Sequence, residues 1–207
     1  MNRRFVLLVS CLFCLLPAAV RAGDFGPEIV ISIHDQTLAL VQNGRAIEKF
    51  RISSSRFGIG DEFGSYKTPL GTLWVCNKIG ENLPLGAVIQ HRNATGEVLR
   101  ANAPGRDPIV TRVIWLKGLF GETQNAYARC IYIHGTPEER TLGKPASFGC
   151  IRMRSKDVVK VYDAVGIGAH VIISEKRLAA VLSEERATSQ LAAASNAAGS
   201  SSANAPH

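Results

Sequence analysis

The sequence predicts a mostly β protein, a single sandwich or barrel-like sheet that carries one helix after its last cysteine, Cys150. Short runs in which apolar residues alternate with other residues recur along the chain, which is typical of strands with one buried face. Helical spacing of apolar residues follows directly after Cys150. A hydrophobic content of 46% and a charged content of 20% are ordinary for a globular protein, and 207 residues suffice for one domain with a core.

The first 22 residues have the pattern of a secretory signal peptide. A short basic segment, Asn2-Arg3-Arg4, precedes an apolar run over residues 5–16, and Val20-Arg21-Ala22 offers small residues at a cleavage site. The apolar run is too short for a stable membrane span. We therefore expect residues 1–22 to be removed and the protein to work in the periplasm or cell envelope.

The charge of the mature chain is modest. Loss of three arginines lowers the count of basic residues from 24 to 21 against 17 acidic residues, a formal charge of +4. That excess suits work on an acidic polymer. No run of Lys or Arg indicates nucleic-acid binding, so we expect no nucleic-acid partner. We also expect a monomeric protein.

Removal of the signal peptide determines how many cysteines remain to form disulfide bonds. Cys11 and Cys14 leave with the signal peptide, so Cys76, Cys130 and Cys150 remain. An oxidising compartment favours pairing, and a bond between Cys76 and Cys130 would leave Cys150 as the free thiol. Two isolated thiols are an alternative of at least equal weight, because sequence does not bring two cysteines within bonding distance. No His/Cys cluster has the spacing of a zinc site, so we expect no metal and no cofactor.

The first half of the mature chain is rich in hairpin signals. Asn43-Gly44 stands between two alternating runs and predicts a tight two-residue turn. Further on, Lys67-Thr68-Pro69-Leu70-Gly71 forms a proline-initiated turn that leads into another strand. The strands predicted here are 29–33, 37–42, 45–52 and 72–77.

In residues 78–108 the apolar residues follow no regular spacing. Pro84, Pro104 and Pro108 interrupt the segment together with several glycines, so we expect no regular element of useful length. A loop of this length inside a compact domain is usually functional or mobile. His91 is expected to be an exposed loop histidine.

Strand character resumes at residues 109–116, and a second strand is predicted over 130–134. Successive side chains of a strand point to opposite faces, so Cys130, Tyr132 and His134 would share one face of that second strand.

A helix is predicted after the last cysteine. Ser155-Lys156-Asp157 indicates its start, with a capping serine and an acid in the first turn. Its core-facing stripe consists of Val158, Val161, Tyr162 and Val165. A closing strand is predicted over 169–173, and residues 175–207 are expected to hold a short helix, 178–186, and a disordered Ala/Ser-rich tail.

His134 and Cys150 are the candidate catalytic pair. They lie 16 positions apart, and each stands beside a glycine, Gly135 or Gly149. A cysteine thiolate attacks carbonyl carbon well when a nearby base takes its proton and backbone N–H groups stabilise the oxyanion. By spacing alone, a buried cysteine and a core histidine at strand ends explain the pattern equally well.

The motif residues resemble a known family. His134-Gly135-Thr136 and Ser147-Phe148-Gly149-Cys150-Ile151-Arg152-Met153 are similar to the signature of the L,D-transpeptidases, whose catalytic domain is of the YkuD type. The resemblance extends over residues 28–174, with the specific motifs in 132–153. The sequence departs from the signature at one place, since Phe148 stands where the family has a second histidine.

The resemblance implies a function and its partners. Cys150 would attack a peptidoglycan tetrapeptide stem, release D-Ala and form a thioester, and an amine would then accept the acyl group. The acceptor would be a neighbouring stem or an outer-membrane lipoprotein. The region corresponding to 78–108 covers the active site in such enzymes, so a lid is expected there.

The resemblance also assigns supporting roles. Gly149 and Cys150 would donate backbone N–H groups to the oxyanion, the carbonyl of Gly135 would orient His134, and Ser147 would support the cysteine. The residues themselves suggest three substrate-binding positions, Arg152, Tyr132 and Phe148: Tyr132 shares a strand face with His134, and the charge of Arg152 would hold a substrate carboxylate or raise the thiolate fraction of Cys150. A structural ion pair is the alternative for Arg152, and packing in the sheet is the alternative for Tyr132.

Other functions remain open at this point. Water in place of the amine would make the protein an L,D-carboxypeptidase, and a hydrolytic cysteine peptidase would use the same pair. Phe148 is also compatible with a catalytically weak domain that only binds peptidoglycan.

Overall fold

Ten strands and two α-helices make up the computed structural model, which describes residues 25–201. The predicted signal peptide, 1–22, lies outside the described residues. The strands are β1 Glu28–Ser32, β2 Thr37–Gln42, β3 Arg45–Ser53, β4 Gly71–Ile79, β5 Ala87–Gln90, β6 Asn93–Val98, β7 Val110–Lys117, β8 Tyr132–Gly135, β9 Ile151–Met153 and β10 His170–Ser174. The helices are α1 Ser155–Ala164 and α2 Leu178–Ser201, with single 3-10 turns at Gly121–Thr123 and Glu139–Thr141.

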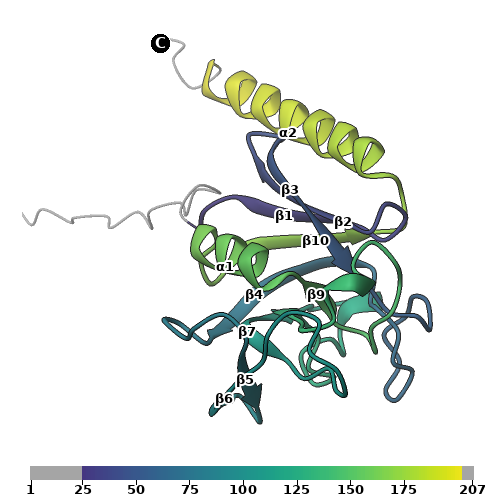
Figure 1. The fold of residues 1–207 in the computed structure, drawn as a ribbon. Helices are drawn as coiled ribbons and strands as arrows, with labels where there is room; N and C mark the ends of the chain where they lie inside the picture. The colour runs from purple at the N-terminus through teal and green to yellow at the C-terminus, as the bar shows by residue number, and fades with distance from the viewer. Residues whose placement is uncertain (1–24, 202–207) are drawn as a thin grey trace, which may run out of the picture.

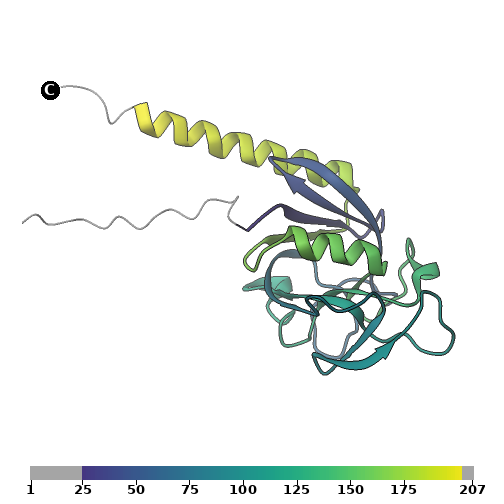
Figure 2. The same cartoon turned by 60° about the vertical axis from the view of Figure 1, so that its left-hand side comes forward.

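Eight of the strands close into a barrel. They are hydrogen-bonded in the order β4-β10-β1-β2-β3-β9-β8-β7, and β7 pairs back with β4. The remaining two, β5 and β6, form a hairpin attached to β7. Figures 1 and 2 show this hairpin at one end of the molecule and α2 at the other. The predicted fold class, a mostly β barrel-like sheet with a helix after Cys150, is therefore confirmed.

The barrel interior and α1 share one apolar core. Strand residues with no exposed surface, such as Ile31, Ile114 and Ile151, fill it from several sides. The predicted stripe of α1 packs on the same core: Val158, Val161, Tyr162 and Val165. Burial of about four such side chains supplies several kcal/mol, which fixes α1 and the strand that leads into it.

The N-terminal hairpin follows its sequence pattern closely. β2 spans the predicted residues, and the turn to β3 has both Asn43 (φ 52°) and Gly44 (φ 68°) in the left-handed region. That conformation is the reason Asn-Gly is favoured in two-residue hairpin turns.

Residues 78–108 differ from the prediction. The segment contains the β5–β6 hairpin, closed by a two-residue turn at His91 (φ 49°) and Arg92 (φ 69°) between the paired residues Gln90 and Asn93. The expectation of no regular element was wrong because β6 is exposed along its whole length and shows no alternation. Its turn also lacks the Gly or Asn that marks most such turns.

The start of α1 also needs a correction. The residue before the helix is Arg154, which makes no side-chain cap, and Ser155 is the first helical residue. The backbone N–H of Ser155 donates to the Glu139 carboxylate at 3.1 Å. A carboxylate from a distant segment thus replaces the predicted capping serine.

α2 is longer than the predicted helix 178–186. It continues through the Ala-rich segment to Ser201. The Ala-rich composition was expected to give a disordered tail. Alanine also has the highest helix propensity, so the same composition is compatible with the helix found here. Leu178, Val181 and Leu182 pack on the outer side of β1 and β2. None of the helices in residues 25–201 is long and apolar enough to span a membrane.

Candidate active site

Two parallel strands, β8 and β9, bring the predicted pair together. Ile133 is the register partner of Ile151, and His134 is the partner of Arg152. Ile133 and Ile151 point into the barrel core, so His134 and Arg152 lie on the opposite face. Cys150 directly precedes β9 and packs on that same face.

The Cys150 sulfur sits between two backbone groups. Its Sγ accepts from the N–H of Tyr132 at 3.4 Å and donates to the carbonyl oxygen of Cys130 at 3.3 Å. The residue keeps part of its surface exposed. Desolvation of the sulfur nevertheless raises the pKa of the Cys150 thiol to about 11, and the N–H of Tyr132 offsets only part of that effect. The resting nucleophile is therefore a neutral thiol.

His134 is held in the form that a general base requires. Its Nδ1 lies 2.8 Å from the carbonyl oxygen of Gly135. A carbonyl oxygen only accepts, so Nδ1 carries the proton and Nε2 is free to take one. Burial lowers the pKa of His134 to about 4, against a smaller opposing effect of the bond to Gly135. The imidazole is thus neutral at ordinary pH.

No hydrogen bond joins the two side chains in the described residues, although the pairing of β8 with β9 puts them on the same face. Each already has backbone partners, the Cys150 thiol with Cys130 and the His134 ring with Gly135. Catalytic hydrogen bonds are often long in a free enzyme and tighten when substrate binds. The arrangement suits proton transfer during attack on a substrate, from a neutral thiol to a neutral imidazole.

The two glycines of the motif lie so close to neighbouring backbone that a side chain would be crowded. A Cβ on Gly135 would lie 2.6 Å from the carbonyl oxygen of Val110 on β7. Gly149 has a φ of +120°, and its Cβ would lie 3.2 Å from the carbonyl oxygen of Lys67. Any other residue at Gly149 would strain the turn that presents Cys150.

Ser147 and Thr68 fix that turn. Ser147 Oγ donates to the carbonyl oxygen of Cys150 at 2.6 Å and accepts from the N–H of Gly149 at 3.2 Å. Thr68 Oγ1 donates to the carbonyl oxygen of Gly149 at 2.9 Å. The Gly149 N–H, predicted to stabilise the oxyanion, is therefore already occupied in the free protein.

Arg152 belongs to a partly buried ion pair. Its guanidinium lies 2.7 Å from a carboxylate oxygen of Asp107, whose other oxygen accepts from the Thr136 hydroxyl. The structure therefore realises the alternative considered for Arg152, a structural ion pair. The pair also acts on the base, since the charge of Arg152 lowers the pKa of His134 and that of Asp107 raises it.

Tyr132 and Phe148 occupy different surroundings. Tyr132 is buried, with its ring edge-on to Trp115 at 5.5 Å, and burial raises the pKa of its phenol. Phe148 is 52% exposed and contacts the rings of Phe57 and Tyr66. The guanidinium of Arg56 lies 4.2 Å from the centre of the Phe148 ring. Tyr132 thus lies next to the sulfur, whereas Phe148 belongs to a surface cluster of aromatic rings.

A cavity of about 250 Å³ lies one residue away from the nucleophile, since neither Cys150 nor His134 lines it but two neighbours of the Cys150 sulfur do. Cys130 and Tyr132, the two residues whose backbone groups contact the Cys150 sulfur, line it. His91 and Arg92 from the β5–β6 turn line it as well, and its apolar wall consists of Ile89, Ile109 and Val113. The segment expected to form a lid therefore does reach the site.

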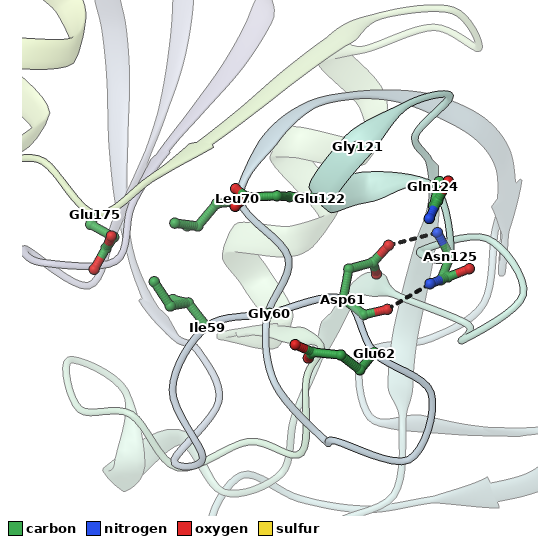
Figure 3. Close-up of a pocket in the computed structure, with 10 residues that line it drawn as sticks. All are labelled: Ile59, Gly60, Asp61, Glu62, Leu70, Gly121, Glu122, Gln124, Asn125 and Glu175. Atoms are coloured by element: carbon green, nitrogen blue, oxygen red, sulfur yellow. Dashed lines mark hydrogen bonds between the residues drawn. The ribbon is translucent and has the colours of Figure 1, made fainter.

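A larger cavity, of about 480 Å³, lies elsewhere (Figure 3). Asp61 lines it, but its carboxylate is engaged by Arg129 at 2.8 Å and by the N–H of Asn125 at 2.6 Å. Glu62, Glu122 and Glu175 add further carboxylates. An acidic cavity repels an anionic peptide, so of these two cavities the smaller one is the better substrate site.

The three cysteines of the described residues are free thiols. The Sγ of Cys76 donates to the carbonyl oxygen of Trp115 at 3.3 Å, and no bond joins it to Cys130. Cys130 also lies outside β8, with a φ of 56°, so the predicted strand start at residue 130 was wrong. The alternative of isolated thiols is the one that the structure contains.

Sequence reasoning missed three residues of the site. Asp107 and Arg92 lie in the segment predicted to lack structure, and only the pairing of β5 with β7 brings that segment to the site. Thr68 was placed in a proline-initiated turn without a contact of its own to the site, and its hydroxyl contacts the cysteine turn. The Thr68-Pro69 pair was the available sequence signal, whereas Asp107 and Arg92 had none.

Comparison with known proteins agrees with the motif. A family model described as the L,D-transpeptidase catalytic domain, YkuD, matches residues 26–173. The chain is 32% identical over 171 residues to YkuD of Bacillus subtilis (strain 168), which is 77% of this chain and 99% of that protein.

Two solved structures are also similar. An L,D-transpeptidase from Mycobacterium smegmatis shares 18% identity with a TM-score of 0.47, over 72% of this chain and 59% of that chain. L,D-transpeptidase 3 from Mycobacterium tuberculosis, in complex with a faropenem-derived adduct, shares 21% identity with a TM-score of 0.45, over 73% and 61%. The chain thus spans about three fifths of these solved chains.

Proposed function

The chain belongs to the YkuD family of L,D-transpeptidase catalytic domains, and from that premise we propose that it is an exported cysteine L,D-transpeptidase acting on the stem peptides of peptidoglycan. The observation that carries the proposal is the pairing of β8 with β9. The pairing supports the proposal because it puts a proton-accepting His134 and the Cys150 thiol on one face of the barrel, and the two residues that contact the Cys150 sulfur line a cavity.

The first half of the reaction is acylation. Cys150 Sγ attacks the carbonyl carbon between the L-centre of a diaminopimelate residue and the terminal D-Ala, while His134 Nε2 takes the thiol proton. The tetrahedral intermediate collapses, the C–N bond breaks, and the proton passes from His134 to the departing amine of D-Ala. A thioester on Cys150 remains.

The second half transfers the acyl group. An amine of a neighbouring stem attacks the thioester, His134 takes the amine proton, and the proton returns to the Cys150 sulfur as the thioester bond breaks. A lipoprotein lysine is a second acceptor of the same chemistry. Ile89, Ile109 and Val113 give the cavity an apolar wall, which favours an amine over water as the acceptor.

The oxyanion needs donors that the free protein does not yet present. We propose the N–H groups of Gly149 and Cys150. The Gly149 N–H is held by Ser147 Oγ at 3.2 Å, so the oxyanion has to replace that bond. Thr68 and Ser147 keep both carbonyl groups of the turn engaged, which prevents the peptide units from turning away.

Export and oligomeric state are part of the proposal. The signal-peptide pattern of residues 1–22 supports work in the periplasm or cell envelope, where peptidoglycan is accessible. We propose that the protein acts as a monomer.

Product analysis tests this function. The purified protein is incubated with disaccharide tetrapeptide, and the products are identified by mass. A cross-linked dimer that disappears in Cys150→Ala, and persists in the matched control Cys76→Ala, supports transpeptidation. Tripeptide alone indicates a carboxypeptidase, and unchanged substrate contradicts the enzyme.

A further inference from the structure

We propose that Arg92, at the tip of the β5–β6 hairpin, binds a free carboxylate of the acyl donor and thereby positions the peptide against Cys150. The inference rests on the proposed function and names a substrate-binding residue for it.

The hairpin holds Arg92 in an unfavourable backbone conformation. His91 and Arg92 both have positive φ, in a two-residue turn where Asn-Gly is preferred, and the β2–β3 turn of this chain does use Asn43-Gly44. Backbone strain of this kind is concentrated at ligand clamps and active sites. Arg92 does not favour the conformation of this turn, so a role in ligand binding explains its presence better than a role in stability.

Arg92 faces the cavity beside the nucleophile. It lines the cavity of about 250 Å³ together with Cys130 and Tyr132. Its guanidinium carbon lies 5.4 Å from the centre of the Trp115 ring on β7, so the side chain folds toward the barrel. A guanidinium over an aromatic ring keeps its in-plane N–H groups available for a ligand.

The charge of Arg92 has no counterpart in the protein. No carboxylate lines this cavity, and among residues 25–201 no ion pair engages Arg92. Other arginines of the described residues differ, since Arg106 pairs with Glu97 and Arg152 pairs with Asp107. The cavity thus presents an unmatched cation and an apolar wall.

A carboxylate is the ligand that fits this cation. Guanidinium groups bind carboxylates through two parallel N–H bonds, which fix orientation as well as adding affinity. The proposed donor has such a group one residue beyond the bond that is cleaved, on its terminal D-Ala, and another on the side chain of diaminopimelate. Binding either one at Arg92 would set the reacting carbonyl near Cys150.

The test measures binding without turnover. The Cys150→Ala protein without residues 1–22 is titrated calorimetrically with three peptides: the tetrapeptide, its C-terminal amide, and the tetrapeptide amidated on the diaminopimelate side chain. We expect one of the two amidations to weaken binding at least tenfold. In Arg92→Gln the tetrapeptide should bind as weakly as that amide, and Arg92→Lys should retain part of the preference.

The control is Arg45→Gln, the same charge change at an exposed residue on the distant β2–β3 hairpin. It should keep the full preference. Thermal unfolding of Arg92→Gln confirms that the variant is folded. If neither amidation weakens binding, or if Arg92→Gln binds the tetrapeptide as well as the parent does, the inference is wrong.

The same peptides separate this inference from the proposed function. Protein with Cys150 intact that binds the tetrapeptide through Arg92 and yields no product contradicts the function and leaves the inference standing. Product formation with no preference for either carboxylate contradicts the inference alone.

Discussion

His134 Nδ1 donates to the carbonyl oxygen of the next residue, Gly135, over 2.8 Å. This single bond fixes the tautomer and the ring orientation of the base, and it needs no side chain as third member of a triad. Because Gly135 also lets β8 approach β7 closely, one glycine serves both the barrel and the base.

The buried neutral His134 should make stability depend on pH. Its pKa is about 4 in the folded protein and 6.5 when unperturbed, so the unfolded chain binds the proton more readily. We expect the free energy of unfolding to fall by about 3 kcal/mol as the pH drops from about 6.5 to about 4. Urea denaturation at several pH values measures this change.

His134→Asn retains an N–H donor for Gly135 and removes the titrating group, so it should lack that pH dependence. The exposed His170→Asn should keep it. An identical pH profile for His134→Asn and the parent protein would show that His134 is not the group responsible.

The Cys150 thiol should react slowly with alkylating agents at neutral pH. Desolvation raises its pKa to about 11, so the thiolate fraction of the folded protein keeps increasing well beyond pH 9. Iodoacetamide labelling followed by peptide mapping gives the rate at Cys150 for each pH. The urea-unfolded chain should reach its plateau at lower pH, and a plateau near pH 7 in the folded protein would reveal a preformed thiolate.

Asp107→Asn should destabilise the fold by about 2–3 kcal/mol. Arg152 is 9% exposed, and removing the charge of its partner leaves a largely buried guanidinium uncompensated. Chemical denaturation measures the loss, and the double variant Asp107→Asn with Arg152→Gln should lose less than the sum of the two single changes. Glu48→Gln, which breaks the exposed pair with Lys160, should leave stability nearly unchanged. Strict additivity would argue against the Asp107–Arg152 pair.

Replacing the β5–β6 turn by Asn-Gly should stabilise the protein. The double change His91→Asn and Arg92→Gly introduces residues that adopt the left-handed conformation readily. That conformation costs the present residues roughly 1 kcal/mol each, so the free energy of unfolding should rise by about 1–2 kcal/mol. The same variant should lose its affinity for the carboxylate. The reverse exchange in the other turn, Asn43→His with Gly44→Arg, should destabilise. A turn variant that gains no stability would show that the conformation is unstrained.

Short-range sequence patterns predicted those elements of the fold whose structure depends on neighbouring residues. The alternation of β2, the Asn43-Gly44 turn and the apolar stripe of α1 were all readable because each depends on residues within a few positions. The β5–β6 hairpin was not, since its second strand is exposed along its length and pairs without an apolar face. Its attachment to β7 is a long-range contact.

The same division applies to the site. The motif identified His134 and Cys150, but the partners that tune them come from elsewhere in the chain. Asp107 reaches Arg152 from the end of the segment after β6, and Thr68 reaches Gly149 from the turn before β4. Sequence also left the role of Arg152 open between substrate binding and an ion pair, and the ion-pair partner, Asp107, lies 45 residues earlier in the chain.

The central claim is that Cys150 carries the acyl group, and the mass of the intact protein tests it most directly. The protein is mixed with disaccharide tetrapeptide without an acceptor amine, quenched in acid within seconds and weighed by mass spectrometry. We predict an added mass equal to the substrate less D-Ala, mapped to Cys150, absent in Cys150→Ala and present in Cys76→Ala. Release of D-Ala by Cys150→Ala at the parent rate, with no adduct on the parent protein, would contradict the account.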